Sequence, residues 1–395
     1  MTTASPDKPL IAIACGGTGG HLFPGLAVAD KLVARRADVM LLISPKEVDQ
    51  QAVKSAYGMQ VVVLPAVGLT RRHALQFLSG FLGSYRAAKS SFRKRPPQAV
   101  LAMGGFTSAP PVFAGRSFGA ITFLHESNTI PGRANRLLAH FVNQAFVGFS
   151  TAAGGLFNPN VLTTGTPVRP QFERVDPSAC RMALGLAPDQ PVLLVMGGSQ
   201  GATGINDLAL RAIPELIEKM PTLQILHLTG INEQAKVEAA YTGYKGKVVI
   251  RPFLTEMELA LGAANAAVSR AGASSLAELA AMGLPAVLIP YPTAADDHQF
   301  YNAKAFVDAG AAILLDQRRA TAGQLAEAAS RLLQNSDVVD TMRGRLRQLH
   351  MPDAAELIAE KIMLLLEARK GWSSSHAQSR PPQTRGIRHP QALAT

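Results

Sequence analysis

The sequence predicts an α/β protein built from two similar halves, and three observations support that prediction. Short β-rich runs alternate with amphipathic helical runs along most of the 395 residues, which is typical of parallel sheets covered by helices. The run Leu10–Cys15 leads into GGTGG, and Val192–Met196 leads into GGSQG. A third predicted strand leads into AMGGFTSAP at Ala102–Pro110. Repeated strand, glycine loop and helix units indicate two Rossmann-like halves, joined near Gly165–Pro177.

Eleven segments rich in β-branched and aliphatic residues are predicted as strands. They are Leu10–Cys15, Val39–Ile43, Val61–Leu64, Ala99–Ala102, Ile121–Leu124, Gln144–Val147, Val192–Val195, Leu223–Leu228, Val248–Ile250, Ala266–Ser269 and Ala286–Pro290. Helical periodicity lies between them, for example at Gly25–Arg35, Ile205–Lys219 and Ser274–Ala281.

The composition is that of a globular protein. Apolar residues make up 47% and charged residues 17% of a chain long enough for two domains. No apolar run reaches the roughly 18 residues of a membrane span, and the polar first residues predict no signal peptide. Cys15 and Cys180 have no disulfide or metal-site spacing, so we expect both thiols in core packing and the chain in the cytosol.

The net charge of +11 is confined to the first part of the chain. Residues 1–170 carry 17 Lys and Arg against 6 Asp and Glu, whereas residues 171–395 carry 22 of each. The segment Gln50–His125 holds nine basic residues and no acid. Such a block attracts an anionic partner, which is a nucleic acid, a phospholipid or a phosphorylated substrate.

The glycine loops suit a phosphate, because glycine lets the backbone approach a ligand and the following helix directs free N–H groups at it. No lysine follows GGTGGH, which argues against a P-loop, and no acid ends the second strand, which argues against a nicotinamide cofactor. If only one such loop were present, its glycines could equally form a tight turn that serves packing and binds no phosphate. Two loops at the carboxyl ends of two sheets predict a cleft for a nucleotide-like ligand and a second substrate.

Seven motifs resemble the MurG family of N-acetylglucosaminyltransferases, which convert lipid I to lipid II in bacterial peptidoglycan synthesis. In chain order they are GGTGGHLFPGLAVA (Gly16–Ala29), MGGFTSAP (Met103–Pro110), HESNTIPGRANR (His125–Arg136), GTPVRP (Gly165–Pro170), GGSQGATGIN (Gly197–Asn206), SRAGASSLAELAAMGLPAVLIPYP (Ser269–Pro292) and DDHQFYNA (Asp296–Ala303). The resemblance covers the chain from about Leu10 to a final helix near Leu366.

The resemblance implies a GT-B fold, in which two Rossmann-like domains with parallel sheets face each other across a deep cleft. Residues 1–167 are implied to take the lipid acceptor and face the membrane, and residues 168–350 to take UDP-N-acetylglucosamine. A last helix at about 354–369 is implied to return to the first domain. Residues 371–395 are rich in Ser, Pro, Gln and Arg, which predicts a disordered tail.

The resemblance also implies residues that bind the donor. Glu278 is implied to accept both ribose hydroxyls, and the helix start at Ala273–Ser275 to reach the diphosphate. Leu254 matches the position whose backbone holds the uracil, with plain packing as its alternative. The remaining implied contacts to UDP-N-acetylglucosamine are Thr18, Gly19, Gly20, Asn128, Arg169, Ser199, Ala273, Ser274, Ser275, Leu276, Ala277, His298 and Gln299.

Inverting transfer needs a base that takes the proton from the C4 hydroxyl of the muramyl sugar as that oxygen attacks the anomeric carbon. His21 is the first candidate, because histidine titrates near neutrality and a helix start favours its neutral form. Its alternative role is to hydrogen-bond the loop or a phosphate, and Glu126 is the second candidate for the base. The residues expected around the acceptor and its diphosphate are Thr18, Gly19, Gly20, His21 and Asn128.

No metal and no cofactor is expected. Asp296 and Asp297 lack the carboxylate spacing of a metal-dependent transferase, and the GT-B scheme needs no metal. Helix N-termini and Arg169 are expected to stabilise the leaving UDP instead. A salt bridge at the hinge is the alternative for Arg169.

The basic block contains an amphipathic stretch that begins at Arg71. The predicted membrane patch consists of Arg71, Arg72, Leu75, Phe77, Leu78, Phe81, Leu82, Arg86 and Lys89. Apolar side chains among cations suit an anionic leaflet, where each cation adds about 1 kcal/mol, and core packing is the alternative. This patch and the lipid-linked substrate that the resemblance implies together predict a peripheral protein at the cytoplasmic face of the bacterial inner membrane.

Two other functions stay open at this point. One is a different GT-B enzyme, such as a nucleotide-sugar 2-epimerase or a transferase to a soluble acceptor. The other is a non-catalytic protein that binds lipid or nucleic acid. We expect no nucleic-acid partner because no nucleic-acid motif is found.

Overall fold

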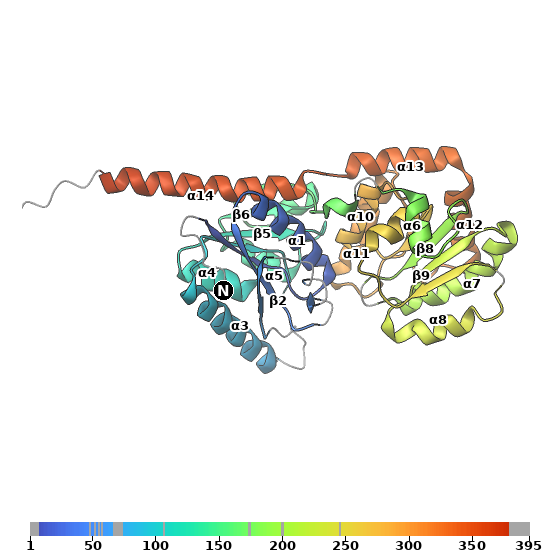
Figure 1. The fold of residues 1–395 in the computed structure, drawn as a ribbon, viewed down its shortest axis with the longest axis horizontal. Helices are drawn as coiled ribbons and strands as arrows, with labels where there is room; N and C mark the ends of the chain where they lie inside the picture. Colours follow the sequence, from blue (N-terminus) through green and yellow to red (C-terminus); the bar gives the residue numbers. More distant parts are fainter. Residues whose placement is uncertain are drawn as a thin grey trace, which may run out of the picture.

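The computed structural model describes residues 8–378 apart from 47–48, 51–52, 54–55, 57, 66–73, 106, 173–174, 199–200 and 245; at 74–76 and 370–378 it describes the helical backbone alone. Two parallel sheets organise this part of the chain (Figure 1). The first has the order β3-β2-β1-β4-β5-β6-β7. Its strands are β1 (Leu10–Ala14), β2 (Asp38–Ile43), β3 (Gln60–Val63), β4 (Ala99–Ala102), β5 (Ile121–Glu126), β6 (Gln144–Val147) and β7 (Val161–Thr163).

The second sheet has the order β10-β9-β8-β11-β12-β13. Its strands are β8 (Val192–Met196), β9 (Gln224–Leu228), β10 (Val248–Arg251), β11 (Ala266–Ser269), β12 (Ala286–Leu288) and β13 (Ile313–Leu314). All eleven predicted strands are confirmed, with ends that differ by no more than two residues. The prediction lacked β7 and β13, because edge strands of three and two residues are too short to show a period.

Helices cover both sheets. They are α1 (Gly19–Ala34), α3 (Ala74–Lys94), α4 (Ala109–Ser117), α5 (Arg133–Ala139), α6 (Pro177–Ala183), α7 (Thr203–Lys219), α8 (Gln234–Ala240), α9 (Met257–Ala263), α10 (Ala273–Met282), α11 (His298–Asp308), α12 (Ala322–Gln334), α13 (Ser336–Leu349) and α14 (Ala354–Gln378). The short 3-10 helices are η2 (Ser150–Gly155), η3 (Pro170–Phe172), η4 (Ile231–Glu233) and η5 (Ala295–Asp297).

The predicted start of the first helix, at Gly25, was wrong by six residues. Helix α1 begins at Gly19 and contains Pro24. Proline in a helix removes one backbone hydrogen bond, which is why the pattern before Gly25 favoured a loop. A Cβ atom at Gly25 would lie 2.6 Å from Cys15 Cβ, so this glycine lets α1 pack directly on the end of β1. Cys15 and Cys180 are both buried and free, as expected for core residues.

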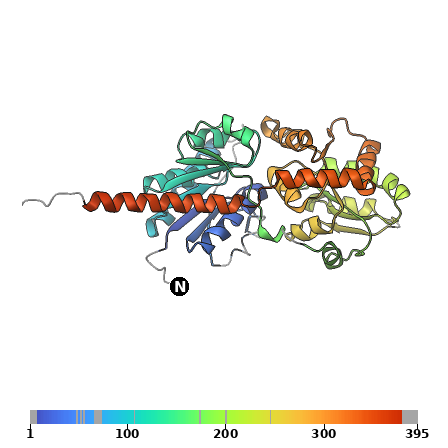
Figure 2. The ribbon, with the colours of Figure 1, turned by 90° about the horizontal axis from the view of Figure 1, so that it is seen from above.

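The last two helices divide between the two sheets (Figures 1 and 2). Helix α13 packs on α10 and α12, and α14 returns along the first sheet against α1. The apolar side of α14, with Ile358, Ala359, Ile362 and Leu366, is buried in the first core. Helix α14 continues to Gln378, so the predicted disorder was wrong for 371–378, where no proline interrupts the helix before Pro381. Residues 379–395 lie outside the described part.

The buried apolar residues form separate groups on either side of the linker. Two clusters lie in residues 10–156 and 355–366, and one lies in residues 172–346. A domain boundary between residues 167 and 168 remains our proposal.

Candidate active site

The first glycine loop is clamped on both sides where β1 meets α1. A Cβ atom at Gly16 would lie 2.2 Å from the backbone nitrogen of Ser44, so only glycine fits there. Gly17 has a φ of 116°, which favours glycine. Its N–H donates to Asp49 Oδ2 at 2.8 Å, and its carbonyl accepts from Lys46 Nζ at 2.6 Å. These bonds hold the loop's peptide groups in one orientation.

Asp49 is a residue of this site that the motifs did not indicate. Its side chain is fully buried, and Oδ2 also accepts from the N–H and the hydroxyl of Ser44, at 3.1 and 2.5 Å. Within the described part, its Oδ1 atom is buried without a hydrogen-bond partner. The only trace in the sequence is that Asp49 is the last acid before the acid-free segment Gln50–His125.

The His21 ring lies between the start of α1 and the loop AMGGFTSAP. A Cβ atom at Gly104 or at Gly105 would lie 3.1 Å from ring atoms, and both glycines have positive φ, so the loop covers the ring closely. Thr18 Oγ1 lies 3.2 Å from His21 Nδ1. Burial lowers the pKa of His21, against the opposing effect of Glu126. The ring is therefore neutral at pH 7, as a general base must be.

Glu126, the second candidate for the base, is buried at the end of β5. Its Oε1 accepts from the N–H and the side-chain amide of Asn128, at 2.8 and 2.9 Å. Its Oε2 accepts from the Gly132 N–H at 2.9 Å and from Asn135 Nδ2 at 2.8 Å. A carboxylate has about four lone-pair sites, and four donors occupy them here. Glu126 therefore orders the loop after β5, and this geometry favours His21 as the base.

A buried amide ties the same loop to the second sheet's helices. Asn302 Oδ1, from α11, accepts from the N–H and the hydroxyl of Thr129 at 2.9 and 3.0 Å. Its Nδ2 donates to Asn128 Oδ1 at 3.0 Å. Both polar atoms of the Asn128 side chain are thus engaged by protein groups, from Glu126 on one side and Asn302 on the other.

The N-termini of α1 and α10 meet between the two sheets. Ser274 Oγ donates to the Gly20 carbonyl at 2.8 Å. That carbonyl is available because Pro24, one helical turn later, has no N–H to donate to it. The N–H groups of Thr18, Gly19 and Gly20 donate to none of the described residues. Two helix N-termini directed at one place favour an anion there, because each carries a partial positive charge.

The first turn of α10 consists of Ala273, Ser274 and Ser275, close to the predicted helix start. Leu276 is fully buried in the core, so only its backbone can face a ligand. Ala277 and Glu278 follow in the next turn and are half-buried. Burial raises the pKa of Glu278 to about 7, although Arg169 opposes that shift.

Arg169 lies in the linker between the sheets, beside Glu258 and two aromatic rings. Its guanidinium carbon is 4.5 Å from the centre of the Phe23 ring and 5.2 Å from that of Phe172. The Arg169 Nη2 atom is 3.9 Å from Glu258 Oε2. This ion pair corresponds to the hinge salt bridge that was the alternative role of Arg169. Its Nε and Nη2 atoms are buried without a hydrogen-bond partner in the described part. These donors suit the oxygens of a phosphate.

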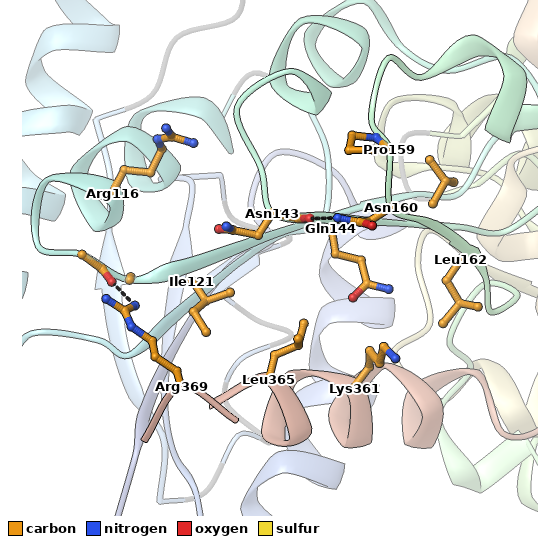
Figure 3. A pocket seen from close by; sticks show the side chains of 13 residues that line it. Arg116, Ile121, Asn143, Gln144, Pro159, Asn160, Leu162, Lys361, Leu365 and Arg369 are labelled. Carbon is orange, nitrogen blue, oxygen red and sulfur yellow. Dashed lines mark hydrogen bonds between the residues drawn. The ribbon is translucent and has the colours of Figure 1, made fainter. Parts of the chain in front are cut away.

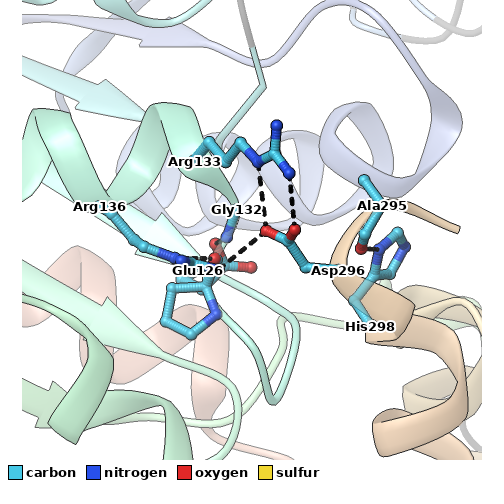
Figure 4. A network of polar contacts seen from close by, with 8 residues as sticks. Glu126, Gly132, Arg133, Arg136, Ala295, Asp296 and His298 are labelled. Carbon is cyan, nitrogen blue, oxygen red and sulfur yellow. Dashed lines mark hydrogen bonds and ion pairs between the residues drawn. The ribbon is translucent and has the colours of Figure 1, made fainter.

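Asp296 connects η5 to α5 of the first sheet (Figure 4). Its carboxylate accepts from Arg133 Nη2 and from Arg136 Nη2, each at 2.9 Å. Asp296 and Asp297 have φ values of 52° and 50°, which are strained for residues other than glycine. Because two arginines already neutralise the Asp296 carboxylate, it is poorly suited to bind a cation.

The other predicted donor residues fall in three places. His298 and Gln299 begin α11, where His298 Nδ1 lies 2.8 Å from the Ala295 carbonyl and Gln299 Oε1 accepts from the Tyr291 N–H at 2.9 Å. Leu254 is half-buried against the second core, so packing accounts for its side chain. Ser199 lies outside the described residues.

The predicted membrane patch falls on α3 and on the segment before it. Arg71, Arg72 and the side chain of Leu75 lie outside the described part. Leu78 and Leu82 of α3 are 54% and 42% exposed. The described part holds no helix that is long and apolar enough to cross a membrane.

The remaining patch residues divide between packing and surface. The Phe77 and Phe81 rings are half-buried and in contact, and Phe81 also contacts Phe113 of α4, so core packing holds for these two. Arg86 is exposed, and Lys89 Nζ lies 5.5 Å from the centre of the Tyr85 ring.

Two models of one enzyme family match this chain. The glycosyltransferase family 28 N-terminal domain matches residues 11–147, and the glycosyltransferase family 28 C-terminal domain matches residues 192–358. The two matches contain the first and second glycine loops, respectively.

Relatives match over nearly their whole length. The UDP-N-acetylglucosamine--N-acetylmuramyl-(pentapeptide) pyrophosphoryl-undecaprenol N-acetylglucosamine transferase of Gloeobacter violaceus is 36% identical over 361 residues, 90% of this chain and 98% of its own length. The protein of the same name from Moorella thermoacetica is 34% identical over 370 residues, 91% of this chain and 99% of its own. The crystal structure of Acinetobacter baumannii MurG matches with a TM-score of 0.68 and 26% identity, covering 90% of this chain and 99% of that one. The chain therefore belongs to glycosyltransferase family 28 and, within it, to the MurG family, whose GT-B fold it shares.

Proposed function

We propose that this chain transfers N-acetylglucosamine from UDP-N-acetylglucosamine to the C4 hydroxyl of the muramyl sugar of lipid I, which gives lipid II for peptidoglycan synthesis. The observation that carries the proposal is the meeting of two helix N-termini, at Gly20 and Ser274, beside the covered ring of His21. Such a place stabilises a diphosphate next to a neutral base. The names of the relatives support this donor and this acceptor.

The proposed reaction is an inverting displacement at the anomeric carbon of the donor sugar. The C4 oxygen of the acceptor attacks that carbon while His21 takes the hydroxyl proton. The bond from the anomeric carbon to UDP breaks, and its electron pair stays on the diphosphate oxygen. N–H groups at the starts of α1 and α10, together with Arg169, stabilise the charge on the leaving UDP. The nearby carboxylates of Glu126 and Asp49 stabilise the imidazolium that forms.

We assign the donor to the second domain. Glu278 accepts the ribose hydroxyls, the backbone of Leu254 holds the uracil, and the first turns of α10, from Ala273 to Ala277, hold the diphosphate. His298 and Gln299 read the sugar hydroxyls, with Ser199 and Asn128 as further contacts. Thr18, Gly19 and Gly20 hold phosphate oxygens from the first domain. The scheme uses no metal, because Arg169 and the helix N-termini supply the positive charge.

The decisive experiment is transfer of labelled N-acetylglucosamine from its UDP donor to a lipid I analogue in the presence of EDTA. Labelled disaccharide product is expected from the native chain. His21→Ala should lose most turnover and keep UDP binding, whereas His140→Ala, which removes an exposed histidine stacked on Phe157 in the same domain, should keep turnover. Absence of product with tight UDP binding would move the acceptor assignment to another GT-B reaction, and UDP-N-acetylmannosamine as product would identify a 2-epimerase.

We also infer that the chain works as a peripheral protein on the cytoplasmic face of the bacterial inner membrane. The exposed Leu78 and Leu82 on a basic helix support this inference. Replacing both by glutamate should release the protein from anionic vesicles and leave transfer to a soluble acceptor unchanged. Ile231→Glu, at an exposed apolar residue of the second domain, is the matched control and should keep vesicle binding.

A further inference from the structure

Arg169 has two buried hydrogen-bond donors that no described protein group accepts. Its Nε and Nη2 atoms are both shielded from solvent, and the side chain as a whole is 12% exposed. Arg169 follows the carboxyl end of β7, whereas a cavity of about 910 Å³ beside α14 lies at the amino ends of β5, β6 and β7 (Figure 3). Arg169 does not line that cavity. Its donors therefore need a partner at the carboxyl edge of the sheet, where the candidate active site lies.

Glu258, in the first turn of α9, faces these donors but accepts no hydrogen bond from them. Its Oε2 atom is 3.9 Å from Arg169 Nη2, and an N–H···O hydrogen bond needs about 2.7–3.2 Å. Oε2 is itself buried without a hydrogen-bond partner in the described part of the chain, and the Glu258 side chain is 20% exposed. This ion pair holds the guanidinium through charge alone and leaves both facing atoms open to a stronger partner.

Two aromatic rings keep the guanidinium in place beside this acid. Phe23 belongs to α1 of the first domain, and Phe172 belongs to η3 of the linker and is only 1% exposed. A guanidinium that lies over a ring face is held without using its in-plane N–H groups. Arg169 is therefore positioned by the rings and balanced in charge by Glu258, and its N–H groups are left for a ligand.

Glu258 also acts on Glu278, the residue assigned to the ribose. Helices α9 and α10 and the 3-10 helix η3 contact one another. Burial raises the pKa of Glu278 to about 7, Arg169 opposes that shift, and Glu258 adds to it. Burial raises the pKa of Asp30 on α1 as well, and Arg169 again opposes the shift. No charged group of α11 or α13, which also contact α10, is among the described groups that shift the pKa of Glu278.

We propose that Glu258 is a positioning residue that holds Arg169 between turnovers and yields it to the diphosphate of the donor. The inference rests on the proposed donor and extends its site to a residue that none of the seven motifs contains. A phosphate oxygen at about 2.7–2.9 Å displaces a carboxylate at 3.9 Å, because short charge-assisted hydrogen bonds are the strong ones. When UDP leaves, Glu258 takes the guanidinium back, so Arg169 is not left as an unpaired buried charge. The carboxylate of Glu258 therefore weakens UDP binding and favours product release.

The test is calorimetric titration of UDP into the native chain and into Glu258→Gln from pH 6 to pH 8. At pH 8 the variant should bind UDP roughly tenfold more tightly, because no carboxylate competes for Arg169. Its binding should also weaken at a lower pH than in the native chain, since Glu278 loses the negative neighbour that raises its pKa. Glu256→Gln removes an exposed carboxylate of the same segment, bound to the Thr255 hydroxyl, and should leave the Kd and its pH midpoint unchanged.

Two further variants separate this role from a structural one. Glu258→Asp keeps the charge and should keep the pH midpoint near its native value. On an Arg169→Gln background, Glu258→Gln should no longer tighten UDP binding, because the guanidinium for which the two anions compete is gone.

Two results would overturn the proposal while the donor assignment stands. One is UDP binding by Glu258→Gln at pH 8 that is equal to or weaker than native binding, as a structural role for Glu258 predicts. The other is tighter binding that persists on the Arg169→Gln background, which would assign the effect to direct repulsion between Glu258 and the diphosphate. Absence of UDP binding by the native chain would overturn the donor assignment and this proposal together.

Discussion

Donor binding should depend on pH through Glu278. Burial, with a smaller contribution from Glu258, raises the pKa of this carboxyl to about 7, and Arg169 opposes the shift. If the ionised form accepts the ribose hydroxyls, UDP binding is nearly complete at pH 8 and weakens as the pH falls through 7. About one tenth of the carboxyl is ionised at pH 6, so the Kd for UDP should rise roughly tenfold between pH 8 and pH 6, or about 1.4 kcal/mol.

Calorimetric titration of UDP from pH 6 to pH 8 measures this effect, with Glu278→Gln as the matched variant. The variant loses a charged acceptor, worth about 1.5–3 kcal/mol, so its Kd at pH 8 should be roughly 10–150 times higher. The phosphate of UDP also titrates, with a pKa near 6, but it does so equally in both proteins. The difference between the two curves therefore reports Glu278. Parallel curves for the native chain and the variant would refute the ribose assignment.

Three further predictions concern the titratable side chains of Asp49, Asp296 and His227. Asp49→Asn should lower kcat about 10–100-fold with little change in donor KM, because the Gly17 amide loses a charged acceptor. Asp38→Asn is the control: Asp38 begins β2, binds Arg95, and should leave kcat unchanged when it is replaced. Equal kcat values for Asp49→Asn and the native chain would contradict the role of Asp49 in holding the loop. Asp296→Asn should raise the donor KM while Tm changes little, since an exposed ion pair adds little stability. An unchanged donor KM would show that this ion pair has no part in donor binding. Burial lowers the pKa of His227 to about 4. The neutral ring therefore contributes fully to the free energy of unfolding above about pH 6.5, and about 3 kcal/mol of that free energy is lost as the pH falls from 6.5 to 4. Between pH 7 and pH 4.5, urea unfolding should show a smaller loss of this free energy for His227→Gln than for the native chain.

The sequence was sufficient where local pattern determines structure. All eleven predicted strands are strands in the structure, and the loops after Ala14 and Met196 are glycine-rich because the backbone must turn sharply there. The ordered motifs also identified the family, which the matches to relatives confirm. Local pattern failed at Gly19–Pro24, where a helix begins through two glycines and a proline that propensity places in a loop.

The contacts between distant segments were decided only by the tertiary structure. Asp49 stands in no motif, and its role comes from lying under Gly17, 32 residues earlier in the chain. The Gly20 carbonyl is left without a helical donor by Pro24, yet its actual donor, Ser274, is 254 residues away. A sequence shows which backbone group lacks a local partner, because that depends on residues one turn apart. Which distant side chain supplies the partner depends on how two separate cores dock, and no local period in the sequence encodes that.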